Sequence, residues 1–125
     1  ISNLNKTAVC AWANWINDNR SMVIPENSIS KLPSAELSHD QVDPFDYDLI
    51  SPLVDEIIKG EKSIKDLINS GFDSKIVLET YNTIMKNEYK RRQAPIGIRV
   101  TNKAFGNGRR FPIVNHYKEN IWCSE

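Results

Sequence analysis

The sequence has no long hydrophobic run, little cysteine or histidine, and no net charge. Its 16 basic residues balance its 16 acidic residues, and 40% of the 125 residues are hydrophobic. This composition excludes a polar disordered tail, which combines few apolar residues with a large net charge. Runs of large aliphatic residues are short, as at Ile76-Val77-Leu78, whereas a transmembrane helix needs about 20 apolar residues. We therefore expect one globular domain, or part of one, with no membrane span.

Cysteine and histidine are too few and too scattered for a metal site or a disulfide framework. Cys10 and Cys123 lie near opposite ends of the chain, without metal-ligand spacing, so we interpret both as free thiols in a reducing cytosol. His39 and His116 lack partners at ligand spacing, and we expect both at the surface. No basic-then-apolar leader opens the chain, so we expect no secretory signal and a cytoplasmic location.

The zero net charge hides a strong asymmetry along the chain. Residues 1–85 hold 7 basic and 13 acidic residues, a formal charge of −6. Residues 86–125 hold 9 basic and 3 acidic residues, a formal charge of +6. Such a basic segment binds a nucleotide, a nucleic acid or the acidic surface of its own protein, or it is only a solvated helix end and tail. Composition leaves these alternatives open.

Apolar periodicity predicts a first helix over residues 7–17, with Asn5 as its N-cap. Trp12 and Trp15 give this helix a large apolar face that needs a partner. Residues 19–46 follow without a lasting period, and three prolines interrupt them. A connection of this length is usually functional or disordered. We interpret it as a functional loop.

The next helix is predicted from the apolar spacing between Tyr47 and Ile58, and it ends at Gly60. The position of Pro52 leaves two possible starts for this helix. Either the helix begins at Ser51 with Pro52 in the first turn, or a longer helix kinks at the proline.

Capping signals predict two further helices. Ser63, with an acidic residue three positions on, begins a short helix, and Gly71 is a left-handed stop. Asp73 caps the longest helix, over about residues 74–92, whose apolar side chains, Tyr89 among them, should face the core. The rest of the chain carries only turn signals.

Three consecutive cations, Lys90, Arg91 and Arg92, end this long helix. They either favour the negative end of the helix dipole, by about 0.3–1 kcal/mol each, or hold phosphate or carboxylate. A short helix, a glycine turn and a longer basic helix also outline a helix-turn-helix unit. Recognition helices read bases from their N-terminal turns, and here those turns are acidic and apolar. Nucleic-acid binding is therefore disfavoured. An independent helical module that binds nucleic acid or protein is kept as an alternative function for the chain.

Two positions nearer the start of the chain are weaker candidates. Lys6 lies at the start of the first predicted helix, where a cation opposes the dipole. Ser34 follows a proline in the loop and precedes a carboxylate. Each is either an ordinary surface residue or a ligand contact.

Four segments stand out together by their order and spacing. They are residues 33–37 (PSAEL), 71–73 (GFD), 87–95 (NEYKRRQAP) and 104–113 (AFGNGRRFPI). As a set they resemble the C-terminal part of the glutamine-dependent NAD⁺ synthetases. The resemblance extends over nearly the whole chain, and its tail resembles this long form rather than the shorter ammonia-dependent one.

The resemblance implies a mostly α fragment that completes an α/β, Rossmann-like ATP-pyrophosphatase domain of the adenine nucleotide alpha hydrolase type. Residues 1–18 would be the last helix of that core, and residues 19–46 a loop on the substrate side. Residues 47–93 would form a helical subdomain, and residues 94–125 a C-terminal tail.

The family uses ATP and Mg²⁺ to adenylate the carboxylate of deamido-NAD⁺, and ammonia released from glutamine then displaces AMP. By resemblance, Lys6 and Ser34 contact ATP, while Lys90 and Tyr89 lie near deamido-NAD⁺. The resemblance assigns no catalytic residue and no metal ligand to this chain.

The family's Ser-Gly-Gly-x-Asp-Ser loop is absent. We therefore expect the isolated chain to be inactive and to hold no cofactor tightly. Its expected partners are deamido-NAD⁺, ATP, and the glutaminase and ATP-pyrophosphatase parts of a longer polypeptide. An exposed Trp12 and Trp15 face would favour a homo-oligomer.

Overall fold

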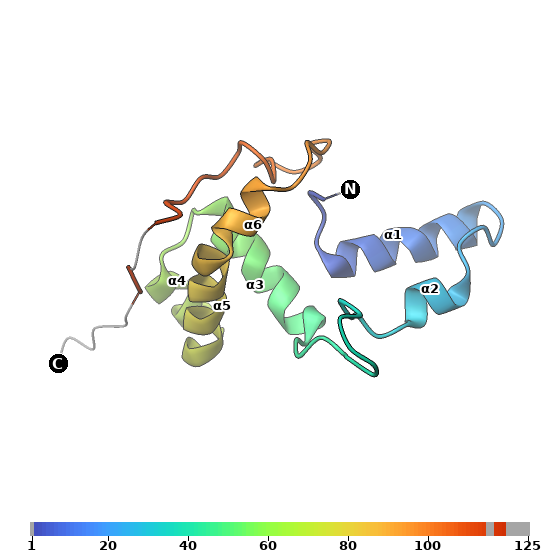
Figure 1. Cartoon of the computed structure of the whole chain (residues 1–125), viewed down its shortest axis with the longest axis horizontal. Coiled ribbons are helices and arrows are strands. Elements are labelled where there is room, and N and C mark those ends of the chain that lie inside the picture. The colour runs from blue at the N-terminus through green and yellow to red at the C-terminus, as the bar shows by residue number, and fades with distance from the viewer. Residues whose placement is uncertain (1, 115–116, 120–125) are drawn as a thin grey trace.

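A computed structural model describes residues 2–114 and 117–119 of the chain. Within these residues the chain is helical and has no strand, as expected for the fragment. Figure 1 shows α3 to α6 gathered in one cluster, while α1 and α2 extend to one side of it. No helix in the described part is long and apolar enough to cross a membrane. The helices are α1 (Lys6–Asn19), α2 (Glu26–Ser30), α3 (Tyr47–Lys59), α4 (Ile64–Asn69), α5 (Ser74–Lys86) and α6 (Glu88–Arg92).

The predicted caps set the helix ends. The Asn5 side chain accepts a hydrogen bond from the backbone N–H of Ala8 at 2.8 Å and so begins α1. Ser63 and its acidic partner form a complete capping box at the start of α4. Gly60 ends α3 with φ of 67°, and Gly71 follows α4 with φ of 100°, conformations that glycine adopts without the steric cost of a Cβ. These local predictions are confirmed.

The structure adds detail to residues 19–59. The segment interpreted as a functional loop contains the short helix α2, and the Asn17 side chain bonds both the N–H and the C=O of Ile24 just before that helix. Of the two starts that Pro52 left open for the next helix, the structure has the longer one. The helix begins at Tyr47, because the Asp46 carboxylate caps it by accepting from two backbone N–H groups, and Pro52 therefore lies inside α3.

The long helix predicted over residues 74–92 is interrupted at Asn87. The Asn87 side chain donates to the Thr83 carbonyl at 2.8 Å and so competes with the helical hydrogen-bond ladder. After the interruption Glu88 is buried, with 1% of its surface exposed, and Tyr89 is 44% exposed. The expectation that Tyr89 faces the core is therefore wrong.

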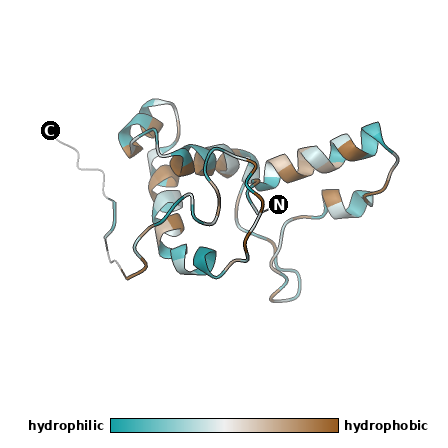
Figure 2. Ribbon diagram, turned by 90° about the horizontal axis from the view of Figure 1, so that it is seen from above, coloured by the Kyte–Doolittle hydropathy of each residue, from teal (hydrophilic) through white to brown (hydrophobic). Residues whose placement is uncertain are grey.

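The core is small and lies between α3, α4 and α5. Its buried apolar residues are Leu53, Ile57, Leu67 and Val77. By contrast, α1 has no buried residue, and Trp12 and Trp15 are 55% and 53% exposed. Figure 2 shows apolar positions along α1 in the part of the chain farthest from the cluster. The apolar face predicted for the first helix is therefore largely uncovered.

Candidate functional site

The basic end of the long helical segment is organised by a buried ion pair within α6. The Nε of Arg91 donates to Oε2 of Glu88 at 2.7 Å, and the Arg91 Nη2 donates to the other carboxylate oxygen. That same oxygen accepts from Arg92 and from the backbone N–H of Phe111, each at 3.2 Å. Hydrogen bonds from Arg91 lower the pKa of Glu88 to about 2, so this carboxylate is charged at neutral pH.

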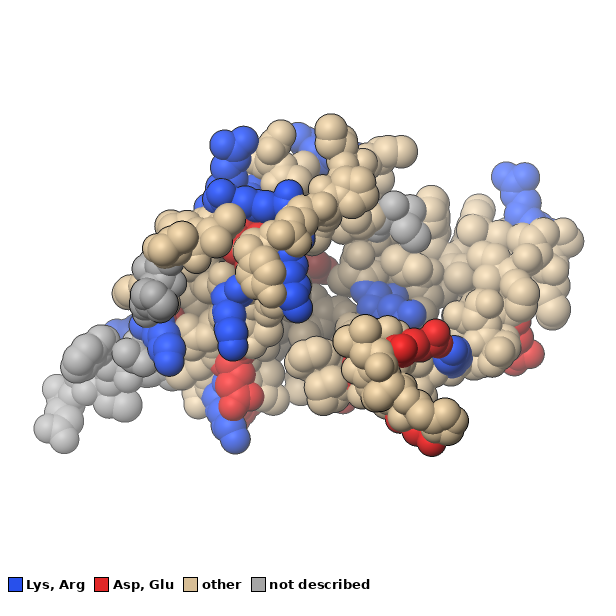
Figure 3. All heavy atoms as spheres, in the orientation of Figure 1, with Lys and Arg blue, Asp and Glu red and all other residues tan. Residues whose placement is uncertain are grey.

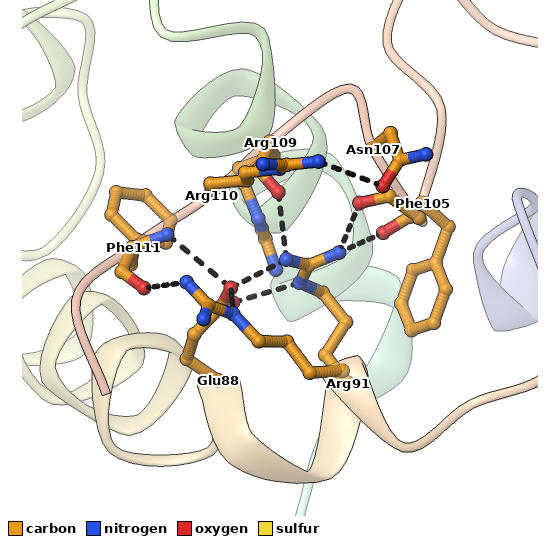
Figure 4. Close-up of polar contacts among 9 residues, drawn as sticks. Glu88, Arg91, Phe105, Asn107, Arg109, Arg110 and Phe111 are labelled. Atoms are coloured by element: carbon orange, nitrogen blue, oxygen red, sulfur yellow. Dashed lines mark hydrogen bonds and ion pairs between the residues drawn. The ribbon is translucent and has the colours of Figure 1, made fainter. Parts of the chain in front are cut away.

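Arg91 also fixes the segment that follows α6 (Figure 4). Its guanidinium donates to the carbonyl oxygens of Phe105, Gly106 and Arg109, in addition to Glu88. A guanidinium has five N–H donors, and these contacts engage all five. Arg91 therefore has no donor left for a ligand, and its hydrogen bonds in the described chain are structural.

A cavity of about 410 Å³ lies between α3, the α5–α6 junction and the segment after α6. Val54, Ile58 and Ile84 provide apolar lining. Its charged lining residues are Lys90, Arg91 and Arg109, and no acidic residue lines it within the described chain. Figure 3 shows basic side chains gathered over α6 and the segment beyond it. The cavity is therefore suited to a ligand that combines an apolar body with an anionic group.

Lys90 is exposed at this cavity, and its Nζ lies 6.0 Å from the centroid of the Tyr89 ring. Among the described residues no ion pair joins Lys90 to an acidic side chain. The ammonium is therefore available to an anion in the cavity.

Arg109 differs from Arg91 because its Nη1, which carries two N–H donors, is buried and has no hydrogen-bond partner among the described residues. The guanidinium carbon lies 5.3 Å from the centroid of the Phe111 ring. Burial, followed by the charge of Arg91, lowers the pKa of Arg109, although an arginine stays protonated at neutral pH.

A second cavity, also of about 410 Å³, lies between the N-terminal segment and α3. It shares Val54, Ile58, Phe105 and Arg109 with the first. Its wall is closed by Asn3, whose side chain donates to Thr101 Oγ1 at 2.7 Å and accepts from the Val100 N–H at 2.8 Å. Arg109 thus lines two adjacent cavities.

The NAD synthase family model matches residues 1–94 of the chain, which is most of its length. The chain belongs to the NAD synthase family. It is 36% identical over 120 residues to the glutamine-dependent NAD(+) synthetase of Synechocystis sp., a match that covers 94% of this chain and 21% of that protein. It is 37% identical over 125 residues to the Thermotoga maritima protein of the same name, covering 97% of this chain and 22% of that protein.

A third relative, the glutamine-dependent NAD(+) synthetase of Acinetobacter baylyi, is 38% identical over 122 residues, which cover 94% of this chain and 23% of that protein. The chain therefore spans about a fifth of the length of the curated relatives that it matches. The resemblance stated from the sequence motifs is confirmed at the level of the family.

The NAD synthase match includes the four site residues expected from the sequence, which lie in different places. Lys90 lines the first cavity, whereas its neighbour Tyr89 is exposed and does not line it. Ser34 is half-buried in the loop, where its Oγ accepts from the Glu36 N–H at 3.0 Å, and it lines a separate hollow. Lys6, the first residue of α1, lines neither this hollow nor the cavity at Lys90. Their ligand contacts stay predictions.

Sequence reasoning did not single out Arg109 as a site residue in this NAD synthase chain. The signal was present, because Arg109 lies in the quoted 104–113 motif directly after a turn at Gly108. What the sequence does not reveal is that all five donors of Arg91 are hydrogen-bonded, while Nη1 of Arg109 has no partner among the described residues.

Proposed function

We propose that this chain is the C-terminal, substrate-side part of a glutamine-dependent NAD⁺ synthetase. Such an enzyme amidates deamido-NAD⁺ to NAD⁺, using ATP and ammonia released from glutamine. The observation that carries the proposal is the exposed Lys90 at a cavity whose charged lining residues are all cationic. Deamido-NAD⁺ carries a ring carboxylate and a pyrophosphate, so its charge is complementary to such a cavity.

Each predicted contact has a distinct physical role. The Lys90 ammonium is a point charge that meets an anionic group of deamido-NAD⁺, and the adjacent Tyr89 ring offers an apolar surface. Lys6 and Ser34 contact ATP, with charge from the first and a hydroxyl from the second. An ATP phosphate would offset the unfavourable position of Lys6 at the helix N-terminus.

We assign no magnesium ligand to this chain. Among the described residues no group of three His, Cys, Asp or Glu side chains lies close enough to hold a metal ion, but Mg²⁺ is usually bound by one or two carboxylates together with substrate phosphates. The proposal therefore rests on the sequence, which lacks the pyrophosphate-binding Ser-Gly-Gly-x-Asp-Ser loop. We propose that the ATP phosphates need that loop from elsewhere in the enzyme and that the 125 residues alone do not catalyse NAD⁺ synthesis.

A chimera tests the proposal. This chain would replace the matching segment of the Thermotoga maritima relative, and NAD⁺ formation would be measured with deamido-NAD⁺, ATP and glutamine. We expect the chimera to form NAD⁺ and the isolated chain to show no turnover. A chimera that is folded by circular dichroism and still hydrolyses glutamine, yet forms no NAD⁺, would contradict the synthetase assignment. Turnover by the isolated chain would contradict its proposed dependence on the rest of the enzyme.

The helix-turn-helix alternative gains no support from the geometry. The helix that would precede the turn, α4, has six residues, and the first turn of α5 is capped by the carboxylate of Asp73. That carboxylate would face the phosphate backbone at the end where a recognition helix reads DNA.

A further inference from the structure

We propose that Arg109 is the second cation of the cavity at Lys90 and that it binds the carboxylate or phosphate of a ligand with a planar apolar ring. The identity of that ligand rests on the proposed function. The assignment of Arg109 rests on its own geometry and on the charges around it.

The unpartnered Nη1 atom of Arg109 is the first part of the argument. Buried polar groups are nearly always hydrogen-bonded, and buried charges are paired. The neighbouring Arg91 follows this rule with all five donors engaged, whereas Arg109 Nη1 is buried without a partner. The described chain therefore does not satisfy the Arg109 guanidinium as it satisfies that of Arg91. Because Arg109 also lines the cavity, an anion bound there would lie beside this charge.

The second part is the local excess of positive charge. Glu88 is the acidic group that acts on Arg109, and Arg91 is a like charge beside it. Both oxygens of Glu88 already accept from Arg91, and one of them also accepts from Arg92 and a backbone N–H. Glu88 therefore does not neutralise Arg109 as well. With Lys90 on the same cavity, the site has two cations without a carboxylate of their own.

The third part is the apolar side of the cavity, which limits the ligand class. Val54, Ile58 and Ile84 provide a surface for a flat ring, and a volume of about 410 Å³ lies within the usual range for small-molecule sites. A pyridine ring that carries a carboxylate, or is joined to a nearby phosphate, matches both features. A guanidinium can grip either group with two parallel hydrogen bonds.

Three probes identify the bound group. Nicotinic acid mononucleotide has both carboxylate and phosphate, nicotinamide mononucleotide has the phosphate alone, and nicotinate has the carboxylate alone. Each would be titrated into the 125-residue chain and followed by amide chemical shifts. The variants are Arg109→Met and Arg109→Lys. Arg110→Met is the matched control, because Arg110 is exposed and its side chain bonds Asn107 at 3.3 Å.

We expect the wild-type chain to bind nicotinic acid mononucleotide saturably. Arg109→Met should weaken binding about tenfold or more, because a charged hydrogen bond is lost, while Arg110→Met changes it little. If Arg109→Met also weakens the binding of nicotinate, the carboxylate is the bound group. If it also weakens the binding of nicotinamide mononucleotide, the phosphate is the bound group. If Arg109→Met does not fold, Arg109→Lys decides: weaker binding supports the two-bond grip, and unchanged binding contradicts it.

Two results would overturn the assignment: no saturable binding of any probe at millimolar concentration, or equal binding by the wild type and a folded Arg109→Met variant. Either result, together with an active chimera, removes Arg109 from the site and leaves the proposed function standing. Arg109-dependent binding together with an inactive chimera would keep Arg109 in the site and contradict the proposed function.

Discussion

Glu88 and Arg91 lie one helical turn apart in α6, both buried, and their paired side chains join that helix to the segment that follows it. The carboxylate accepts the Phe111 N–H, and the guanidinium holds three backbone carbonyls of residues 105–109. The wall of the cavity at Lys90 therefore depends on one ion pair.

Replacing Glu88 should destabilise the chain strongly. Glu88→Gln leaves Arg91 buried without a counter-charge, which costs about 3–5 kcal/mol, a large part of the stability of a small domain. Urea unfolding followed by circular dichroism measures the change. Glu79→Gln is the control, since Glu79 forms an exposed pair with Lys75 at 3.9 Å, and such pairs contribute about 1 kcal/mol or less. Equal decreases in the free energy of unfolding of the two variants would show that the buried pair stabilises the chain no more than the exposed one.

The same pair predicts a pH dependence of stability. The pKa of Glu88 is lowered from 4.5 to about 2 in the folded chain. A lowered folded-state pKa favours the folded state above the unfolded value, and this contribution is lost as the pH falls from 4.5 towards 2. The free energy of unfolding, measured between pH 6 and pH 2, should fall more steeply for the wild type than for Glu88→Gln. Parallel curves would exclude Glu88 as the source.

Lys90→Ala should affect substrate binding and leave folding unchanged. The ammonium is exposed and lies at the cavity. In the chimera the KM for deamido-NAD⁺ should rise about tenfold or more, the effect of losing one charged hydrogen bond. Lys86→Ala, on the last turn of α5, is the control. An unchanged KM for Lys90→Ala would remove this residue from the site.

The exposed indoles of α1 should drive self-association of the isolated chain. Trp12 and Trp15 form an apolar face on a helix without a buried residue, and such faces seek partners. Light scattering should show oligomers, and a variant with Trp12→Ser and Trp15→Ser should shift the population towards monomers. A monomeric wild type at high concentration would contradict this expectation.

Local signals account for the parts of the fold that the sequence predicts. The caps at Asn5, Ser63 and Asp73 follow from side chains that satisfy nearby backbone groups, so a short window of sequence contains the cause. The interruption at Asn87 is harder to predict, because an asparagine in an apolar-periodic stretch competes with the helix only when its side chain turns back to Thr83. Because helical periodicity carried past Asn87 places Tyr89 toward the core, the sequence does not predict that this side chain is exposed.

The candidate site depends on pairings between distant segments. Lys90 could be selected from its motif and its charge. The difference between Arg91 and Arg109 arises only when the chain after α6 folds back and presents its carbonyl groups to one arginine and not to the other. No periodicity or spacing rule distinguishes two arginines in that way.

The contact of Asn3 with Val100 and Thr101 joins residues almost a hundred positions apart. During synthesis α3 to α6 leave the ribosome before Val100 and Thr101, the residues that contact Asn3 at the wall of the second cavity. Closing so large a loop is slow relative to forming helices. Nascent chains should therefore acquire their helical content first and the enclosed hollow last.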